Sequence, residues 1–87
     1  MRTKRLIVQN EHGVHARVAL KVVETVKRQS AQITICNGCT KVDGCSILEL
    51  LLLGAAQGSE LEVVARGGDE DKAIRDLEEL FSGGLGI

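Results

Sequence analysis

The order in which hydrophobic periodicity changes along the chain is its strongest constraint on the fold. Arg5 to Val8 alternates with a period of two, which predicts a short strand, and polar residues with Gly13 interrupt it. From Ala16 to about Arg28 the period becomes that of a helix. The predicted buried stripe of this helix is Ala16, Ala19, Leu20, Val23 and Val26, whereas Val22 lies off the stripe and is expected to be partly exposed.

Three more strands follow from alternation and turn signals. Residues 33–36 alternate, and Asn37-Gly38 predicts a hairpin turn before the chain returns from Thr40 to Val42. A last strand ends at Gly67-Gly68. Its alternating apolar residues are Leu61, Val63 and Ala65.

Two further helices carry recognisable start signals. Ser46 and Glu49 have the spacing of a capping box, in which the hydroxyl and the carboxylate each accept from a first-turn N–H. The predicted helix is short and very apolar, reaches Leu53 and is closed by Gly54. The last helix begins with negative charge at residues 69–71. Its stripe is Ala73, Ile74, Leu77, Leu80 and Phe81.

The resulting order, β-α-β-β-α-β-α, predicts an α+β fold. With four strands, the economical arrangement is an antiparallel sheet covered on one face by three helices, which is an open-faced sandwich. The last strand can fill the gap between the first and second strands, because the crossover is right-handed. We expect one domain over residues 1–82 and a loose, glycine-rich tail at 83–87.

Charge and hydropathy exclude several classes of partner. The formal net charge is -1 and Phe81 is the only aromatic residue, so we expect no nucleic-acid binding. The longest apolar run, residues 50–56, is interrupted by Gly54 and is far shorter than the roughly 20 residues of a membrane span. The basic N-terminus precedes only three apolar residues, too few for a signal peptide. We therefore expect a monomeric, cytoplasmic protein without membrane insertion.

The three cysteines allow a further reading. An odd number fits a reducing cytosol better than a disulfide scaffold. Cys36 and Cys39 form a CxxC, a spacing associated with metal or redox chemistry, but it straddles the predicted hairpin and only Cys45 is nearby. We predict no metal site and no cofactor, and the redox state of the three thiols stays open.

The candidate functional residue is His15, where a strand's exit loop turns into a helix. The unpaired N–H groups of a first helical turn bind anions. Imidazole near neutral pH is nucleophilic and can accept a phosphoryl group. Arg17 adds a planar set of donors for phosphate oxygens. His12 is better explained as a solvated loop residue than as an assistant of His15.

Three segments together resemble a known family, the phosphocarrier HPr of the bacterial phosphoenolpyruvate-dependent sugar phosphotransferase system. These are HGVHAR at 12–17, DGCSILELLLLGAAQGSELEV at 43–63 and GGDEDKAI at 67–74. The resemblance implies that His15 receives a phosphoryl group from enzyme I and passes it to enzyme IIA proteins. Arg17 and the N–H groups of Ala16, Arg17 and Val18 would hold the phosphate. Such a protein is a carrier that acts with its partners rather than an independent catalyst.

The resemblance also implies regulation. The serine matching Ser46 is phosphorylated in some bacteria by a dedicated kinase/phosphorylase, although Ser46 would be favoured here as a helix cap without any regulation. Two residues depart from the family's pattern: Val18 stands where a proline is usual, and Cys45 where a basic residue often precedes the serine. Valine adds a backbone donor to the first turn, and the loss of the basic charge weakens the case for a kinase.

The helix after Ser46 has more apolar residues than one buried stripe can use. Leu50 and Leu53 suit the core, so others must face water and form a docking surface. The predicted docking residues are Ile47, Leu48, Leu51 and Leu52. Two alternatives to a carrier remain: a regulatory binding protein that signals through Ser46 and this helix without sugar transport, and a thiol or metal module based on the cysteines.

Overall fold

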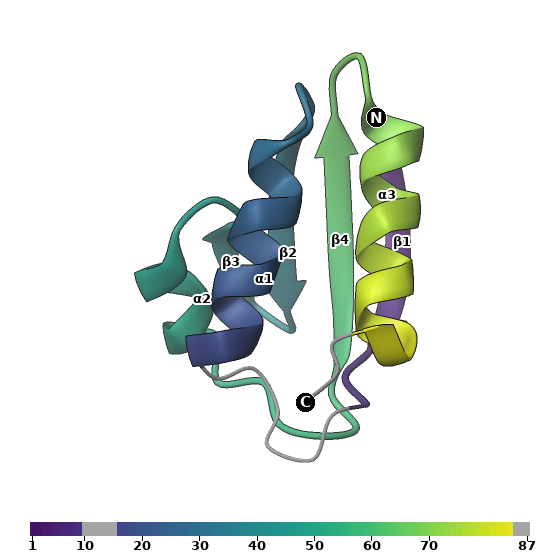
Figure 1. The fold of residues 1–87 in the computed structure, drawn as a ribbon. Helices are drawn as coiled ribbons and strands as arrows, with labels where there is room; N and C mark the ends of the chain where they lie inside the picture. Colours follow the sequence, from purple (N-terminus) through teal and green to yellow (C-terminus); the bar gives the residue numbers. More distant parts are fainter. Residues whose placement is uncertain (10–15, 85–87) are drawn as a thin grey trace.

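The computed structural model describes residues 1–9 and 16–84 and contains the predicted order of elements (Figure 1). The strands are β1 (Arg2–Ile7), β2 (Gln32–Asn37), β3 (Thr40–Asp43) and β4 (Glu60–Arg66). The helices are α1 (Ala16–Lys27), α2 (Ile47–Leu52) and α3 (Glu70–Glu79), followed by a π-helical turn, η1 (Leu80–Gly84). In the part of the chain that is described, no helix has the length and apolar character needed to cross a bilayer.

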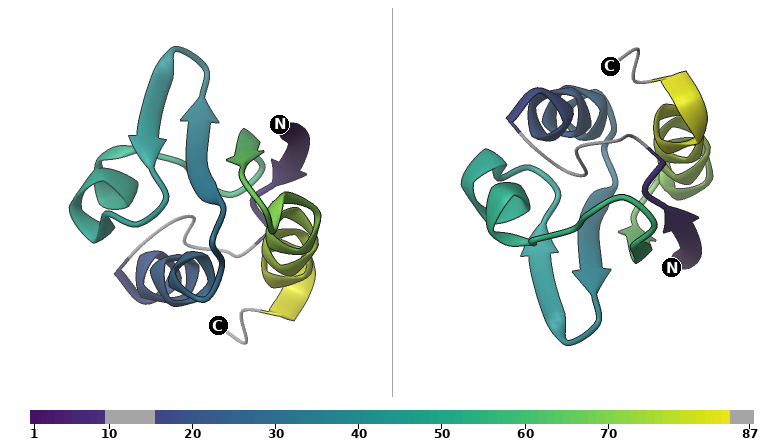
Figure 2. Two further views of the ribbon diagram at one scale, coloured as in Figure 1. Left: turned by 90° about the horizontal axis from the view of Figure 1, so that it is seen from above. Right: turned by 90° about the horizontal axis from the view of Figure 1, so that it is seen from below.

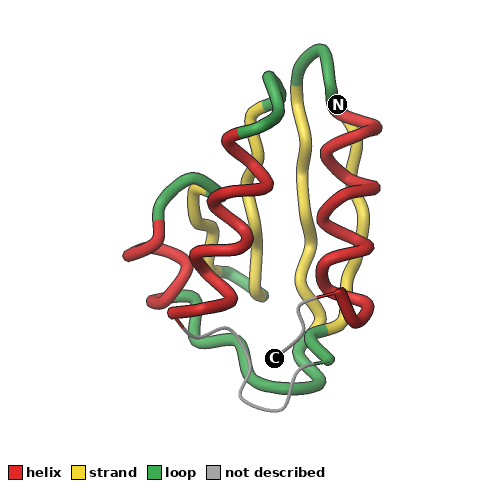
Figure 3. The backbone as a smooth tube through the Cα atoms, viewed as in Figure 1, coloured by secondary structure: helices red, strands yellow, loops and turns green. Residues whose placement is uncertain are grey.

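The four strands form one sheet in the order β1-β4-β2-β3, with every neighbouring pair antiparallel. The prediction that the last strand lies between the first and second is confirmed. The helices lie on one side of the sheet, as the views along its edges show (Figure 2). In the tube view α1 and α3 run in front of the strands, and α2 lies beside α1 (Figure 3). The open-faced sandwich is therefore the fold of this chain.

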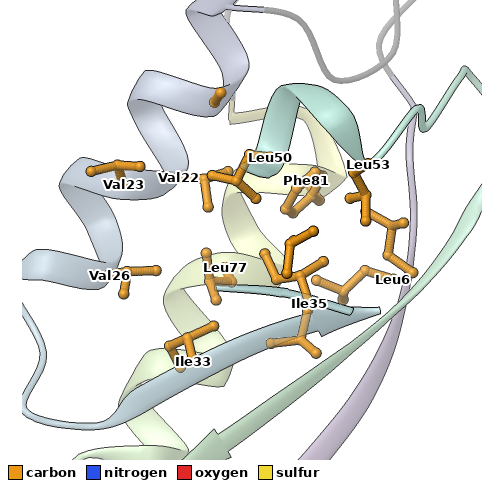
Figure 4. Packing of buried hydrophobic residues seen from close by; sticks show 14 of the residues in the cluster. Leu6, Val22, Val23, Val26, Ile33, Ile35, Leu50, Leu53, Leu77 and Phe81 are labelled. Carbon is orange, nitrogen blue, oxygen red and sulfur yellow. The ribbon is translucent and has the colours of Figure 1, made fainter. Parts of the chain in front are cut away.

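Alternation along each strand places one apolar set beneath the helices. Leu6 pairs with Leu61, and Ile35 lies between Val63 on one side and Val42 on the other. All five side chains are buried and belong to one cluster, since alternate residues of a strand point to the same face. Figure 4 shows this cluster, to which the helices contribute Val22, Val23, Val26, Leu50, Leu77 and Phe81.

The predicted buried stripe of α1 is confirmed at Ala19, Val23 and Val26 and wrong at its other two residues. Leu20 and Ala16 are exposed, whereas Val22 is fully buried. The buried residues are Val18, Ala19, Val22, Val23, Thr25 and Val26. The compact, β-branched valines form a continuous row at spacings of three and four, and this row packs on the sheet in place of the row that contains Leu20.

The hairpin turn lies one residue later than predicted. Asn37 pairs with Thr40 as the last rung of the ladder, so the turn residues are Gly38 and Cys39. Gly38 has a φ of 62° and Cys39 has a negative φ, which matches a turn with glycine in its first central position. Asn37 instead donates from Nδ2 to the carbonyl of Leu53, 3.1 Å away, and so joins the hairpin to the end of α2.

The predicted capping box at α2 is half confirmed. The Ser46 hydroxyl accepts from the Glu49 N–H at 3.2 Å, as expected of an N-cap. The Glu49 carboxylate, however, accepts from the N–H of Asp43 at 3.2 Å, while the Ser46 N–H donates to the Asp43 carbonyl. The tight turn after β3 already satisfies the Ser46 N–H, so the Glu49 carboxylate accepts from an N–H three residues farther back. Gly54, with a φ of 69°, ends the helix as predicted.

The strand and helix ends differ modestly from expectation. β1 begins at Arg2 and ends at Ile7, so Val8 follows the strand, although Leu6 and Val8 are both buried as predicted. The predicted stripe of α3 is confirmed, with Leu77 and Phe81 almost fully buried. Helical structure continues as η1 to Gly84, two residues into the segment predicted to be a loose tail.

Candidate functional site

The predicted phosphate site lies at the N-terminal end of α1. His15 and His12 lie outside the described residues, but α1 begins at Ala16, directly after His15 in the sequence. The side chains of Ala16 and Arg17 are exposed. The side chain of Val18 is fully buried, so only its backbone could contact a phosphate. The predicted change from loop to helix at His15 is thus supported by where the helix starts.

The charges along α1 favour an anion at its start. The first turn contains no acidic residue and carries Arg17, and the last turn carries Lys27. The aligned peptide dipoles give the N-terminus about half a positive charge. None of the acidic side chains in residues 1–9 and 16–84 forms an ion pair with Arg17. The guanidinium and the helix dipole therefore both contribute positive charge to the first turn of α1.

Ser46 is partly buried at the start of α2, and hydrogen bonds of the preceding turn fix its position. The Cys45 N–H donates to the Asp43 carboxylate at 2.8 Å, and the Ser46 N–H donates to the Asp43 carbonyl at 3.1 Å. The hydroxyl accepts a first-turn N–H, which is the position where a phosphate is best tolerated in a helix.

The surplus leucines of α2 face water as predicted, and α1 adds one residue that sequence reasoning missed. Leu50 and Leu53 are buried in the core. Leu20 of α1 is exposed, and α2 lies against α1 near its N-terminal end (Figures 1 and 2). We call the exposed set the α1–α2 patch: Leu20 (48% exposed), Ile47 (39%), Leu48 (68%), Leu51 (39%) and Leu52 (72%).

The three cysteines are free thiols in different surroundings. Cys36 is buried on β2, Cys39 is exposed in the hairpin turn, and Cys45 is exposed before α2. Within the described ranges, no three histidine, cysteine, aspartate or glutamate side chains are grouped so that they could hold a metal ion.

A groove that the sequence gave no reason to expect lies between the C-terminal half of α1 and α3. Its volume is about 310 Å³, and its walls include Thr25, Arg28, Asp76, Glu79 and Leu80. The Arg28 guanidinium donates to the Glu24 carbonyl and to the Thr25 hydroxyl, so part of its donor capacity is used within α1. Because this groove lies at the opposite end of α1 from Ala16, it is separate from the predicted phosphate site.

The fold and the start of α1 define a small open-faced sandwich whose first helix begins with a turn that carries Arg17 and no acidic residue. The family model described as "PTS HPr component phosphorylation site" matches residues 2–83. The chain belongs to the HPr family of the phosphotransferase system.

Individual relatives agree with this assignment. The chain is 37% identical to the phosphocarrier protein HPr of Treponema pallidum, over 93% of this chain and 92% of that protein. The crystal structure of HPr-C-His from Thermoanaerobacter tengcongensis superposes with a TM-score of 0.94 at 33% identity, covering 100% of this chain and 98% of that one. The multiphosphoryl transfer protein of Salmonella typhimurium is 35% identical over 92% of this chain, but the chain spans only 22% of its length.

Proposed function

We propose that this protein is a phosphocarrier that accepts a phosphoryl group on His15 from enzyme I and donates it to enzyme IIA proteins. One observation carries the proposal: α1 begins directly after His15 and has a cationic first turn, in a chain that the phosphorylation-site family model matches over residues 2–83. We expect the exchange to take place in the cytoplasm, with the carrier as a monomer and without a metal or cofactor.

The chemistry follows from the residues around the helix start. A neutral ring nitrogen of His15 attacks phosphorus, and an N–P bond forms as the bond between phosphorus and the donor breaks. The exposed Arg17 and the N–H groups of Ala16, Arg17 and Val18 would hold the phosphoryl oxygens. Transfer to the acceptor reverses these bond changes. Because the first turn is open to solvent, the phosphate remains accessible to the next partner.

The α1–α2 patch supplies the docking surface in this proposal. It consists of Leu20 of α1 and four residues of α2, and α2 packs against α1, the helix that begins directly after His15 in the sequence. A partner that covers the patch removes these side chains from water, and that burial stabilises the complex. Enzyme I and enzyme IIA proteins would use the same patch in turn, since each must reach His15.

Labelling tests the proposal directly. With phosphoenolpyruvate and enzyme I, the wild type should gain one acid-labile, base-stable phosphate, detected by intact-mass spectrometry before and after acid treatment. His15→Ala should gain none, because it lacks the nucleophile. His12→Ala is the matched control, three residues earlier in the sequence, and should label like the wild type. Full labelling of His15→Ala would remove His15 from the mechanism.

We propose regulation at Ser46 as a second function, because this residue lies partly exposed at the start of α2, beside the α1–α2 patch. A phosphate there adds roughly two negative charges at the edge of an apolar surface and should weaken docking. Incubation with an HPr kinase/phosphorylase and ATP should phosphorylate the wild type but not Ser46→Ala. Cys45→Arg restores a basic neighbour and should increase the rate. If the kinase does not phosphorylate the wild type, the proposed regulation is wrong and Ser46 acts only as a helix cap.

A further inference from the structure

The first turn of α1 is attached to the core mainly through one side chain. Ala16 and Arg17 are exposed, and Ala19 contributes only a methyl group. Val18 is fully buried and belongs to the hydrophobic cluster that also contains Leu50 and Leu53. One buried isopropyl group therefore anchors the start of α1 in the hydrophobic core, to which α2 contributes Leu50.

The branched side chain of Val18 has little conformational freedom. In a helix a valine adopts nearly one χ1 rotamer, so its two methyl groups have defined positions. A closely packed interior resists displacement of such a group. The backbone of residues 16–18 is consequently fixed on the core, although Ala16 and Arg17 are exposed, and α2 packs against the same helix.

We propose that Val18 is a positioning residue for phosphoryl transfer, whose buried side chain aligns the first turn of α1 with the docking surface on α2. This inference rests on the proposed function. A partner bound at the α1–α2 patch must present its reacting atom to His15, and Ala16 joins His15 to the helix that Val18 anchors. An error of about 1 Å in such an alignment can lower a rate by about a hundredfold.

The test compares two valines of the same helix. Val18→Ala removes the anchor, and Val26→Ala removes a similarly buried valine about 12 Å farther along α1, at eight residues and 1.5 Å per residue. Both variants should lower the urea midpoint to a similar extent. Single-turnover transfer from phosphorylated enzyme I is then measured against enzyme I concentration, so that kcat and KM are separated.

We expect Val18→Ala to lower kcat by about tenfold with an unchanged KM, because the docking surface is intact and only the alignment is lost. Val26→Ala should keep the wild-type kcat. If Val18→Ala does not fold, Val18→Ile and Val18→Leu replace it in the test. These two side chains have the same number of carbon atoms and differ only in where they branch. The β-branched isoleucine should retain more of the wild-type kcat than leucine.

The outcomes separate this inference from the proposed function. A wild type that accepts no phosphate overturns the proposed function and the role of Val18 with it. A wild type that is phosphorylated, together with equal kcat values for Val18→Ala and Val26→Ala, overturns only the positioning role. A rise in KM without a change in kcat would show that Val18 supports docking and would also overturn the proposal.

Discussion

Replacing Leu48 by aspartate should abolish tight docking without unfolding the protein. Leu48 is 68% exposed, so its side chain contributes little to the core. It is the second residue of α2, where a carboxylate complements the positive end of the helix dipole. We therefore expect Leu48→Asp to retain the wild-type circular dichroism spectrum and a free energy of unfolding within about 0.5 kcal/mol of the wild type.

The loss of affinity can be estimated from the exposed fraction. Full burial of a leucine contributes about 1.5–3 kcal/mol, so covering the exposed two thirds of Leu48 contributes about 1–2 kcal/mol. Leu48→Ala should accordingly raise Kd by about tenfold. The aspartate adds the cost of desolvating a carboxylate without a partner, about 2 kcal/mol or more. For Leu48→Asp the total approaches about 4 kcal/mol, or about a thousandfold in Kd.

Isothermal titration calorimetry with enzyme I measures both constants. Ile7→Ala is the matched control, because Ile7 is 44% exposed and alternates with Leu6, so it lies on the sheet face that the helices leave uncovered. It should bind like the wild type. If both Leu48 variants bind with the wild-type affinity while remaining folded, the α1–α2 patch is not the docking surface and the reasoning from its exposure is refuted.

Three further predictions concern stability. Val18→Pro should cost less than about 1 kcal/mol in urea melts, because the N–H of a third helical residue has no intrahelical acceptor; a loss of several kcal/mol would contradict this. The backbone and side-chain hydrogen bonds from Ser30 hold the pKa of Asp69 below its ordinary value of 3.8. This stabilisation is therefore present above that pH and is lost as pH falls through the lowered pKa; urea melts between pH 5 and pH 2 should show a smaller pH dependence for Asp69→Asn. Gly67→Ala should lose about 1–3 kcal/mol, because φ is 132° and the new Cβ would lie 3.1 Å from the backbone of the residue preceding β2. Gly68→Ala, with open space around it, is its control in the same melts.

The arrangement of strands and helices was predictable because local periodicity and general topology rules suffice for it. Alternation identified Leu61 and Val63 as core residues of the central strand, and handedness placed that strand between β1 and β2. The crowding of leucines in α2 was equally informative. A helix of six residues cannot bury all of them, and the structure leaves Leu48 and Leu52 the most exposed.

Details that depend on neighbouring segments were not predictable from local patterns. The Glu49 carboxylate fits a capping box by its spacing, but the turn after β3 brings the N–H of Asp43 within 3.2 Å of it. Asn37-Gly38 has a strong turn preference, but pairing of Asn37 with Thr40 moves the turn forward by one residue. In both cases a contact set by the ladder between β2 and β3 overrides the preference of a short sequence motif.

The misassignment of Leu20 and Val22 follows from a helix, α1, that is apolar on two sides. One row contains Val18, Val22 and Val26, and a second contains Leu20. A rule that seeks one stripe assigns the largest side chain to the core, although the narrow valines allow closer approach to the sheet. Leu20, which is apolar but exposed, then needs another explanation. Leu20 lies on the helix against which α2 packs, so in the proposed docking it would extend the surface that a partner covers, while the valine row of α1 packs on the core.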